Sequence, residues 1–131
     1  MATYKTAKEI ATDKIVYIDG LATIKEAVRQ MKSNNVEALI IKKRNEQDAN
    51  GIIVLSDIIK GVVVLDKTLE EVSVYELMKK PVISIPASMN ERYVPRFLSN
   101  IGLSAAPVED NGVYVGMVSL KQIIFGMCKE Q

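Results

Sequence analysis

The chain repeats itself at a nearly constant spacing, and this repeat limits its fold more than any other feature. The phrase GIIVLSD, which starts at Gly51, returns as GMVSLKQ at Gly116, and both phrases continue into Ile-Ile. Before the phrases, matching residues lie 67 positions apart, as Glu9 and Glu76 do, and from the two glycines onward they lie 65 apart. The difference falls in one loop, KKRNEQDANG in the first copy and EDNGVYVG in the second. One register with one loop insertion predicts two copies of a single structural unit.

The first copy has the pattern of a β-α-β-β-α unit. The short apolar strand IVYI comes before a helix that is expected to start at Thr23, where Glu26 completes the spacing of a capping box. Apolar residues at helical spacing follow in that helix. The buried strand VEALII (36–41) comes next, and Asn50-Gly51 is typical of a hairpin that leads into the strand GIIVL.

The second copy repeats this pattern with one deviation, because Pro95 lies inside its first helix and should kink or shorten that helix. In each copy a second helix follows the phrase, beginning near Ser56 in the first. We divide the sequence into a first repeat at 1–66, with the N-terminal segment, and a second repeat at 67–131, which opens with the linker 67–75. The predicted fold class is α+β, with tandem β-α-β-β-α repeats packed about a pseudo-two-fold axis.

Composition argues against several classes of function. The 131 residues carry 17 basic and 16 acidic side chains, so the net charge of +1 predicts no basic face for nucleic acid or for a membrane surface. The chain has no histidine, which is the commonest general acid–base and metal ligand, and no GxxxxGK(S/T) phosphate loop. We therefore expect no catalytic residues, no metal site and no required cofactor.

Cysteine usage and hydropathy bear on the compartment. Cys128 is the single cysteine, which allows no internal disulfide and favours a reducing environment. No apolar run approaches the ~20 residues that a membrane-spanning helix needs. The expected location is the cytoplasm.

The order of these motifs resembles the cystathionine β-synthase (CBS) domain pair, also called the Bateman module. The likeness lies in ATIKEAVRQM, VEALII, LSAAPVED and VSVYELMKKPVISIP, and above all in GIIVLSDI and GMVSLKQI. It covers about Lys8 to Gly126, so we expect a stand-alone pair without a second catalytic or membrane domain in this chain.

The resemblance implies a regulatory module that is not an enzyme. Such pairs bind adenosine-containing molecules (AMP, ADP, ATP or S-adenosylmethionine) in the clefts between their repeats, and they often assemble as dimers. They transmit occupancy to an attached or separate effector. For this chain the resemblance implies an adenosine-type ligand, a homodimer and an unidentified partner protein, with neither membrane nor nucleic acid as a partner.

The family phrase is Gly-h-h-Thr/Ser-x-x-Asp, where h is apolar, and its hydroxyl and carboxylate hold the ribose. A carboxylate can accept bonds from both hydroxyls of a ribose diol, and a Ser or Thr adds an adaptable partner. The first copy keeps Asp57 but has Val54 in place of the hydroxyl, whereas the second keeps Ser119 but has Gln122 in place of the acid. Hydrogen bonds to charged groups contribute ~1.5–3 kcal/mol against ~1 kcal/mol for neutral ones. We therefore predict that Asp57 marks the better nucleotide site, and that the Ser119 site is weak, empty or adapted to another ligand.

Other residues complete the nucleotide site that the resemblance implies. Strand backbone and apolar side chains would hold the adenine, and Lys121 stands where many family members carry an arginine that reaches phosphates. The full predicted set is Val54, Ser56, Asp57, Ile83, Ser104, Ala105, Pro107, Ser119, Lys121 and Gln122.

Structural roles compete with these functional ones. Asp57 also fits a first-turn acid of a helix, and the run 104–107 fits a strand whose small residues allow close packing. Lys42 and Lys43 are more typical of a solvated loop than of a phosphate contact. For the whole chain, the alternative to a ligand sensor is a dimerisation or scaffolding module that has lost its ligand, and the two incomplete phrases favour it.

Overall fold

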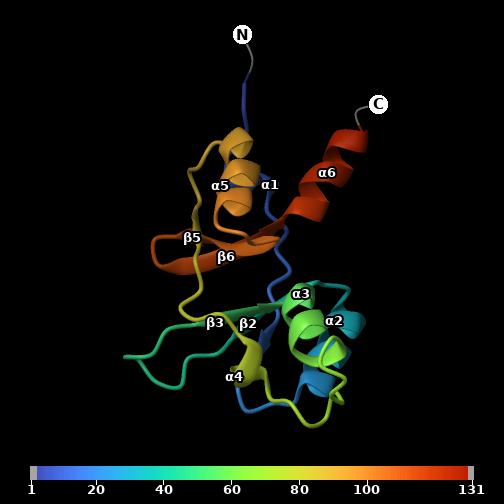
Figure 1. The fold of residues 1–131 in the computed structure, drawn as a ribbon. Helices are drawn as coiled ribbons and strands as arrows, with labels where there is room; N and C mark the ends of the chain where they lie inside the picture. Colours follow the sequence, from blue (N-terminus) through green and yellow to red (C-terminus); the bar gives the residue numbers. More distant parts are fainter. Residues whose placement is uncertain (1–2, 130–131) are drawn as a thin grey trace. The chain divides into compact units, whose positions relative to one another are not determined.

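The computed structural model describes residues 3–129 of the chain, with side chains from residue 3 to residue 127. The side chain of Cys128 falls outside this range. The backbone forms two compact units. We call Val16–Val82 the middle unit, and the residues before Val16 together with those from Ile83 onward the terminal unit. Each unit contains one three-stranded sheet and its own helices, which is the mixed α+β class that the duplication predicts (Figure 1).

The middle unit has the predicted β-α-β-β-α order and ends in a short helical turn. Its elements are β1 (Tyr17–Ile18), α2 (Ile24–Asn34), β2 (Ala38–Ile41), β3 (Gly51–Val54), α3 (Leu55–Ile58), the π-helical turn η1 (Ile59–Val63) and α4 (Val74–Leu77). Strand β1 runs parallel to β2, and β2 pairs antiparallel with β3, so that Leu39 lies opposite Ile53.

Helix α2 begins as predicted at Thr23, whose hydroxyl oxygen accepts a hydrogen bond from the Glu26 N–H at 3.2 Å. The second half of the predicted capping box does not form. The Glu26 carboxylate instead accepts hydrogen bonds from Arg29 and Gln30, one turn further along the helix. The helix ends at Asn35, which adopts the left-handed backbone (φ 54°) common at such positions.

The terminal unit repeats the same order. Its elements are α1 (Ala7–Ile10), β4 (Ile85–Pro86), the 3-10 turn η2 (Glu91–Tyr93), α5 (Val94–Asn100), β5 (Ala105–Asp110), β6 (Val113–Ser119) and α6 (Leu120–Lys129). Strand β4 is parallel to β5, and β5 is antiparallel to β6. Pro95 lies in the first turn of α5, where a missing N–H costs no helical hydrogen bond. The turn η2 replaces the preceding residues of the helix, so α5 has 7 residues against 11 in α2, a shortening that Pro95 predicted.

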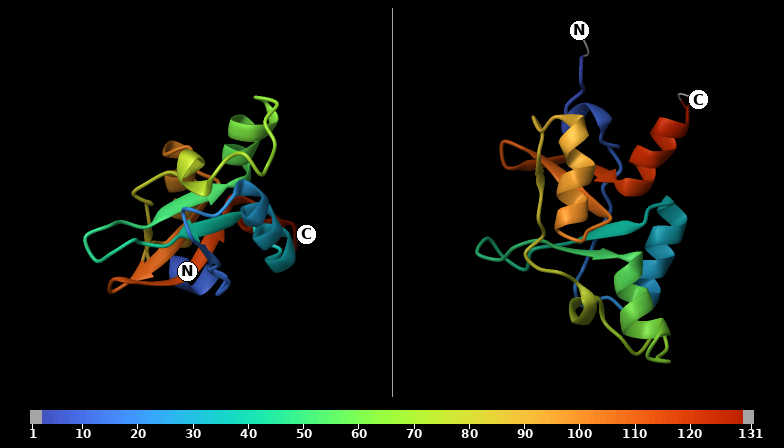
Figure 2. Two further views of the ribbon diagram at one scale, coloured as in Figure 1. Left: turned by 90° about the horizontal axis from the view of Figure 1, so that it is seen from below. Right: turned by 45° about the horizontal axis from the view of Figure 1, so that its top comes forward.

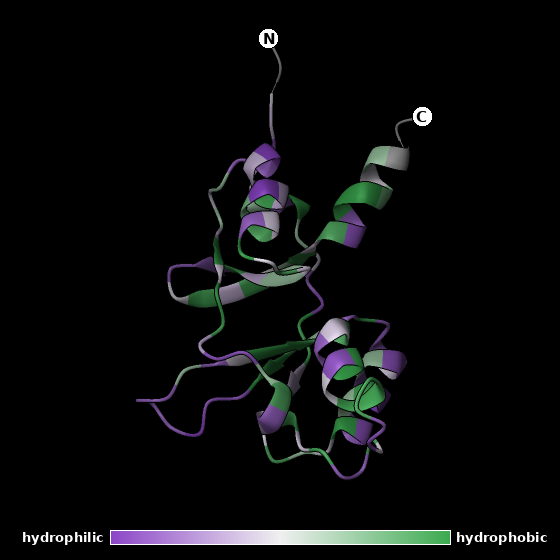
Figure 3. Cartoon of the chain, viewed as in Figure 1, coloured by the Kyte–Doolittle hydropathy of each residue, from purple (hydrophilic) through white to green (hydrophobic). Residues whose placement is uncertain are grey.

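The two hairpins differ in their turns. The hairpin between β2 and β3 forms, but Asn50-Gly51 does not make its turn, because neither residue adopts the left-handed backbone. Asn50 instead donates its side-chain amide to the Ile41 carbonyl at 3.0 Å and closes the loop 42–50. The two-residue turn that Asn-Gly favours lies between β5 and β6, at Asn111 (φ 52°) and Gly112 (φ 82°). The long loop 42–50 extends beyond its strands (Figure 2) and is strongly hydrophilic (Figure 3).

Each unit has its own apolar core, built almost entirely from aliphatic side chains. In the middle unit, the predicted inner face of α2 packs with β1 to β3 and the α3–η1 helix; the buried residues are Ile18, Ile24, Ala27, Met31, Leu39, Ile41, Ile53, Ile58, Val62, Val72 and Val74. In the terminal unit the corresponding residues are Ala7, Ile85, Val94, Leu98, Leu103, Ala106, Val108 and Val118.

Two matching segments of the chain each pack in the unit that they do not lead into. We call residues 6–15 and 73–82 the leading segments, since they match each other at the spacing of 67 residues. The first packs in the terminal unit, where Thr12 and Met117 exchange N–H···O bonds of 2.9 and 2.8 Å. The second packs in the middle unit, where Lys79 and Ile52 exchange bonds of 2.8 and 2.9 Å. Each leading segment thus precedes one unit in the chain and pairs with the last strand of the other. The repeat boundaries at 1–66 and 67–131 stay a prediction about the sequence.

The glycine of each phrase lies where a leading segment passes close to the last strand. A Cβ atom added at Gly116 would lie 2.5 Å from the Thr12 carbonyl oxygen and 2.8 Å from the Ala11 Cβ. At Gly51, the nearest atoms to such a Cβ are the Lys79 carbonyl oxygen and the Met78 sulfur, both at 3.2 Å. The glycine that opens the repeated phrase therefore has a structural cause in both copies.

We predict that Gly116→Ala lowers the free energy of unfolding by about 1–3 kcal/mol, because the new methyl group must push away backbone atoms of the leading segment. Urea denaturation of the purified chain measures this loss. Gly126→Ala is the matched control: no atom lies within 4 Å of its added Cβ, and alanine is favoured in a helix by ~1 kcal/mol. Equal stability of Gly116→Ala and the original chain would contradict the close approach.

Candidate functional site

The structure divides the predicted site residues between the two units. Val54, Ser56 and Asp57 lie in the middle unit, at the junction of β3 and α3. The other members lie in the terminal unit. Ser119, Lys121 and Gln122 lie at the corresponding junction of β6 and α6, Ser104, Ala105 and Pro107 lie in or next to β5, and Ile83 precedes β4.

Asp57 is the best-defined of these side chains. Its Oδ2 accepts a hydrogen bond from the Val54 N–H at 2.9 Å, and its Oδ1 accepts one from the Lys79 ammonium at 2.7 Å. The carboxylate is only 10% exposed, whereas the Lys79 side chain is 51% exposed. Each carboxylate oxygen has two lone pairs, so two acceptor positions remain beyond these two bonds. Val54 is buried and carries no hydroxyl, and the neighbouring Ser56 is exposed.

Lys79 was not among the residues predicted from the sequence. It reaches Asp57 from the second leading segment, and its backbone is fixed because both its N–H and its C=O bond to Ile52. The repeat aligns Lys79 with Thr12, 67 positions earlier, and both residues occupy the same place in the fold. The repeat register could therefore have indicated the position of the Lys79 backbone. An ion pair 22 residues apart in sequence, however, has no local pattern that would reveal it.

The second copy makes a different contact at the same position. The Ser119 hydroxyl oxygen accepts a hydrogen bond from the Gln122 N–H at 3.1 Å, so Ser119 caps α6. The Gln122 side-chain amide donates to the Ile10 carbonyl oxygen in the first leading segment. Both Asp57 and Gln122 thus link the start of a helix to the leading segment that packs in their unit. The replacement of an acid by glutamine keeps this link while removing the charge.

The repeated phrase has the spacing of a capping box, in which an N-cap hydroxyl and an acid three residues later satisfy two backbone amides. Each copy keeps one half of this box. In the first copy Asp57 accepts from the Val54 N–H without a hydroxyl at Val54, and in the second copy Ser119 accepts from the Gln122 N–H without an acid at Gln122. The difference between the two copies, an acid at Asp57 and a hydroxyl at Ser119, can therefore be explained by helix capping without a ligand.

The remaining predicted residues surround the β5–β6 hairpin. Ala105 lies opposite Ser119, and Pro107 lies opposite Met117, one residue after Gly116. The Ser104 carbonyl accepts from the Leu120 N–H at 2.9 Å, so this backbone acceptor is already used.

Two further predicted residues are exposed. Ile83 is 44% exposed at the start of the terminal unit. The Lys121 ammonium lies 5.7 Å from the centre of the Phe125 ring, one turn along α6, in a cation–π contact. The role of Lys121 in holding an anion stays a prediction.

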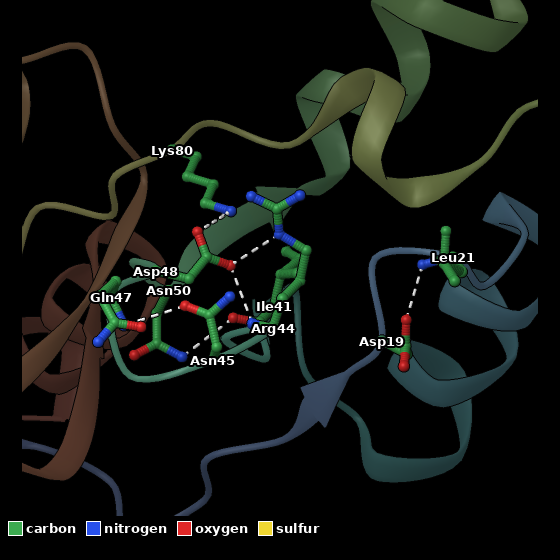
Figure 4. A network of polar contacts seen from close by, with 9 residues as sticks. All are labelled: Asp19, Leu21, Ile41, Arg44, Asn45, Gln47, Asp48, Asn50 and Lys80. Carbon is green, nitrogen blue, oxygen red and sulfur yellow. Dashed lines mark hydrogen bonds and ion pairs between the residues drawn. The ribbon is translucent and has the colours of Figure 1, made fainter.

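The loop 42–50 is ordered by an acid that the sequence did not single out. The side chain of Asp48 is 7% exposed. Its Oδ2 accepts hydrogen bonds from the Arg44 N–H at 2.9 Å and from the Arg44 side chain at 3.1 Å (Figure 4). Lys80, from the second leading segment, forms an ion pair with its other oxygen. Hydrogen bonds from Lys80 and then from Arg44 hold the pKa of Asp48 well below its usual range. Lys42 and Lys43 are exposed, as a solvated loop predicts.

Because the folded-state pKa of Asp48 is depressed, its ionised form contributes stability above the unfolded value near 4, and this contribution is lost as pH falls below it. We therefore predict that Asp48→Asn weakens the pH dependence of unfolding between pH ~6 and pH ~3. Thermal unfolding at a series of pH values measures this pH dependence, and Glu46→Gln in the same loop is the control. Parallel pH profiles for Asp48→Asn and the original chain would contradict the role of this network.

We predict that Ser119→Ala destabilises the chain by about 1 kcal/mol, because the Gln122 N–H loses its capping oxygen. Urea denaturation measures the change. Ser104→Ala, at an exposed position whose backbone carbonyl rather than side chain makes the contact, should change stability by less than about 0.5 kcal/mol. Equal losses of unfolding free energy for the two substitutions would show that the cap at Ser119 does not stabilise the chain more than an exposed serine does.

Among the described residues, no group of three or more His, Cys, Asp or Glu side chains is arranged to hold a metal ion. Within the same residues, no helix has the length and apolar character needed to cross a membrane.

Comparison with known proteins gives a consistent result. The family model for the CBS domain matches the chain twice, at residues 7–64 and at residues 74–128. An uncharacterised protein of Methanopyrus kandleri is 25% identical over 117 residues. The match covers 88% of this chain and 59% of that relative, so this chain spans about three-fifths of the relative's length.

Solved structures of similar fold include CBS proteins of different assembly. A hexameric CBS-CP12 protein from bloom-forming cyanobacteria has a TM-score of 0.88 and 32% identity, over 95% of this chain and 68% of that one. A CBS domain pair crystallised in complex with 5′-methylthioadenosine and S-adenosyl-L-methionine has a TM-score of 0.80 and 23% identity. That match covers 98% of this chain and all of the other, and at this identity it concerns the fold.

Proposed function

Because this chain belongs to the CBS domain family, whose domain pairs are generally regulatory ligand-binding modules, we propose that it senses an adenosine-containing ligand and signals its occupancy to a separate partner protein. No catalytic step is part of this proposal.

The observation that carries the proposal is the position of Asp57. Its carboxylate is held in place by the Val54 N–H, is close to buried, and keeps acceptor positions beyond its two present bonds. These are the properties that a ribose diol requires of its acceptor, since a fixed anion loses little freedom on binding and bonds to it are charge-assisted. The aligned position, Gln122, lacks the charge and already donates to the Ile10 carbonyl. We therefore assign the better site to Asp57 and a weak or adapted site to Ser119 and Gln122.

The adenosine moiety is proposed from the family and from a relative. The CBS domain pair solved with 5′-methylthioadenosine and S-adenosyl-L-methionine has the same fold as this chain. Both of its ligands contain a ribose and an adenine. AMP, ADP, ATP and S-adenosylmethionine are accordingly the candidate ligands of this chain.

Self-association is a further part of the proposal. Leu55, Ile59 and Val63 recur every four residues along the α3–η1 helix, and each is 42–54% exposed. Exposed apolar side chains arranged in this way are typical of a face that pairs with another protein. A homodimer is the simplest closed assembly that such a face allows, and the related cyanobacterial protein is a hexamer.

A ligand-free scaffolding module is the second candidate function. One observation favours it: Asp57 and Gln122 are both engaged by partners within the chain, so each incomplete phrase serves a purely structural role in the present structure. Under this reading the chain would assemble and bind its partner without responding to adenosine compounds.

We predict that at least one of AMP, ADP, ATP or S-adenosylmethionine raises the melting temperature of the chain at about 1 mM, and that Asp57→Asn abolishes the rise. A ligand at ~100 times its dissociation constant stabilises the folded state by about 2.7 kcal/mol, which a melting curve resolves. Asparagine keeps the shape of the side chain but removes the charged acceptor. Differential scanning fluorimetry of the full chain gives the measurement.

Asp66→Asn is the control for this experiment. Asp66 is an exposed acid of the same unit, and its left-handed backbone (φ 55°) accommodates asparagine well. It should respond to the ligand as the original chain does. If no member of the panel changes the melting temperature, the sensor proposal fails and the scaffolding reading is favoured.

A further inference from the structure

Lys79 brings a positive charge into direct contact with the proposed ribose acceptor. Its ammonium lies 2.7 Å from the Asp57 Oδ1, and its backbone is fixed by two hydrogen bonds to Ile52. Only the side chain is therefore free to change partner. An ammonium has three N–H donors, and Asp57 takes one of them. Because the side chain is 51% exposed, a ligand in solvent has access to it.

Lys79 differs from the lysine that follows it. Lys80 pairs with Asp48, which Arg44 also contacts, and its side chain is 25% exposed, whereas the side chain of Lys79 is 51% exposed. Of these two lysines, Lys79 is therefore the one that an anion in solvent reaches more easily.

A ribose diol that bonds to the two remaining acceptor positions of Asp57 would lie beside the Lys79 ammonium. An uncharged nucleoside offers this ammonium no anionic partner. The phosphate of a nucleotide can accept a hydrogen bond from one of its remaining N–H groups, which adds a charge-assisted contact. With S-adenosylmethionine, the positively charged sulfonium faces the lysine, which is repulsive.

We propose that Lys79 makes the Asp57 site selective for adenosine nucleotides that carry a phosphate, over uncharged adenosine and over S-adenosylmethionine. This inference rests on the proposed function, because it takes Asp57 as the ribose acceptor. Lys79 is then a specificity-determining residue.

The second copy explains why the selectivity belongs to one unit alone. Thr12 occupies the place of Lys79, and its hydroxyl lies 3.5 Å from the Met117 carbonyl. Neither Thr12 nor Gln122 carries a charge. The pair of charges is therefore present only in the copy that keeps the acid of the phrase.

The test is isothermal titration calorimetry of the full chain with adenosine, AMP and S-adenosylmethionine. We expect AMP to bind at least about tenfold more tightly than either of the others. Lys79→Gln should reduce the ratio of the adenosine and AMP dissociation constants to about one, and Lys79→Arg should keep the preference. Lys60→Gln, which removes an exposed lysine of the same unit in η1, should keep the original ratio.

A second measurement is independent of any substitution. Raising the NaCl concentration from about 0.05 M to about 0.5 M should weaken AMP binding more than adenosine binding, because salt screens the lysine–phosphate attraction. This series decides the matter if Lys79→Gln does not fold. Equal binding of adenosine and AMP, a preference kept by a folded Lys79→Gln, or a preference that salt does not change would each overturn the inference while leaving the proposed function standing. If neither these compounds nor ADP or ATP, titrated in the same way, bind the original chain, the proposed function itself is wrong, and the inference with it.

Discussion

The rest of the structure depends on one kind of contact: each leading segment pairs with the last strand of the unit in which it packs. In each unit the last strand would present an open edge, and a single residue of a leading segment bonds to it in both directions, Lys79 to Ile52 and Thr12 to Met117. Covering an edge strand protects its backbone groups and removes a site for wrong pairing. Since each segment is adjacent in sequence to the unit that it does not cover, neither repeat of the sequence contains a complete unit. Each unit therefore depends on a segment that the other repeat of the sequence supplies.

This pairing gives the repeated phrase its structural meaning. Glycine opens the phrase because the leading segment passes within contact of that position, most closely at Gly116. The polar residue that closes it, Asp57 or Gln122, bonds back to the same segment. The first requirement leaves no room for a side chain at Gly116 and little at Gly51, and both copies meet it with glycine. The second is met equally by an ion pair or by an amide–carbonyl bond, and here the copies differ.

The sequence was sufficient to predict the number, type and order of the main elements, because apolar periodicity and the repeat register reinforce each other. It located the start of α2 at Thr23 and the shortening of the helix at Pro95, since capping and proline effects are local. It predicted the hairpin between β2 and β3, but Asn50-Gly51 does not form a tight turn there, because the longer loop 42–50 is closed by side-chain contacts. It was wrong about the second half of the capping box at Glu26, which does not form because the Glu26 carboxylate accepts hydrogen bonds from Arg29 and Gln30 in its own helix.

The candidate site was predictable only where it depends on neighbours in sequence. Val54 and Asp57 are three residues apart, and so are Ser119 and Gln122, so the phrase itself indicates their contacts. Lys79 and Lys80 reach their acids from a distant segment, and only the fold brings them there. The ion pairs of Asp57 and Asp48 are thus tertiary contacts, and the phrase alone does not indicate that Lys79 lies beside Asp57.

The placement of Lys79 also limits how a ligand can act on the rest of the chain. Three residues after Lys79 the chain leaves the middle unit at Val82, whose N–H donates to the Asn50 carbonyl at 2.9 Å. In the proposed site a ligand at Asp57 would contact the lysine side chain, whereas these bonds are made by the backbone. A half-exposed ion pair contributes little to stability, so a change in it would release little free energy of its own. A conformational shift requires a difference in ligand affinity between two states. Any signal from this site would therefore come mainly from contacts that the ligand makes in one state and lacks in the other, and the proposed role of the Asp57–Lys79 pair is to select which ligand makes them.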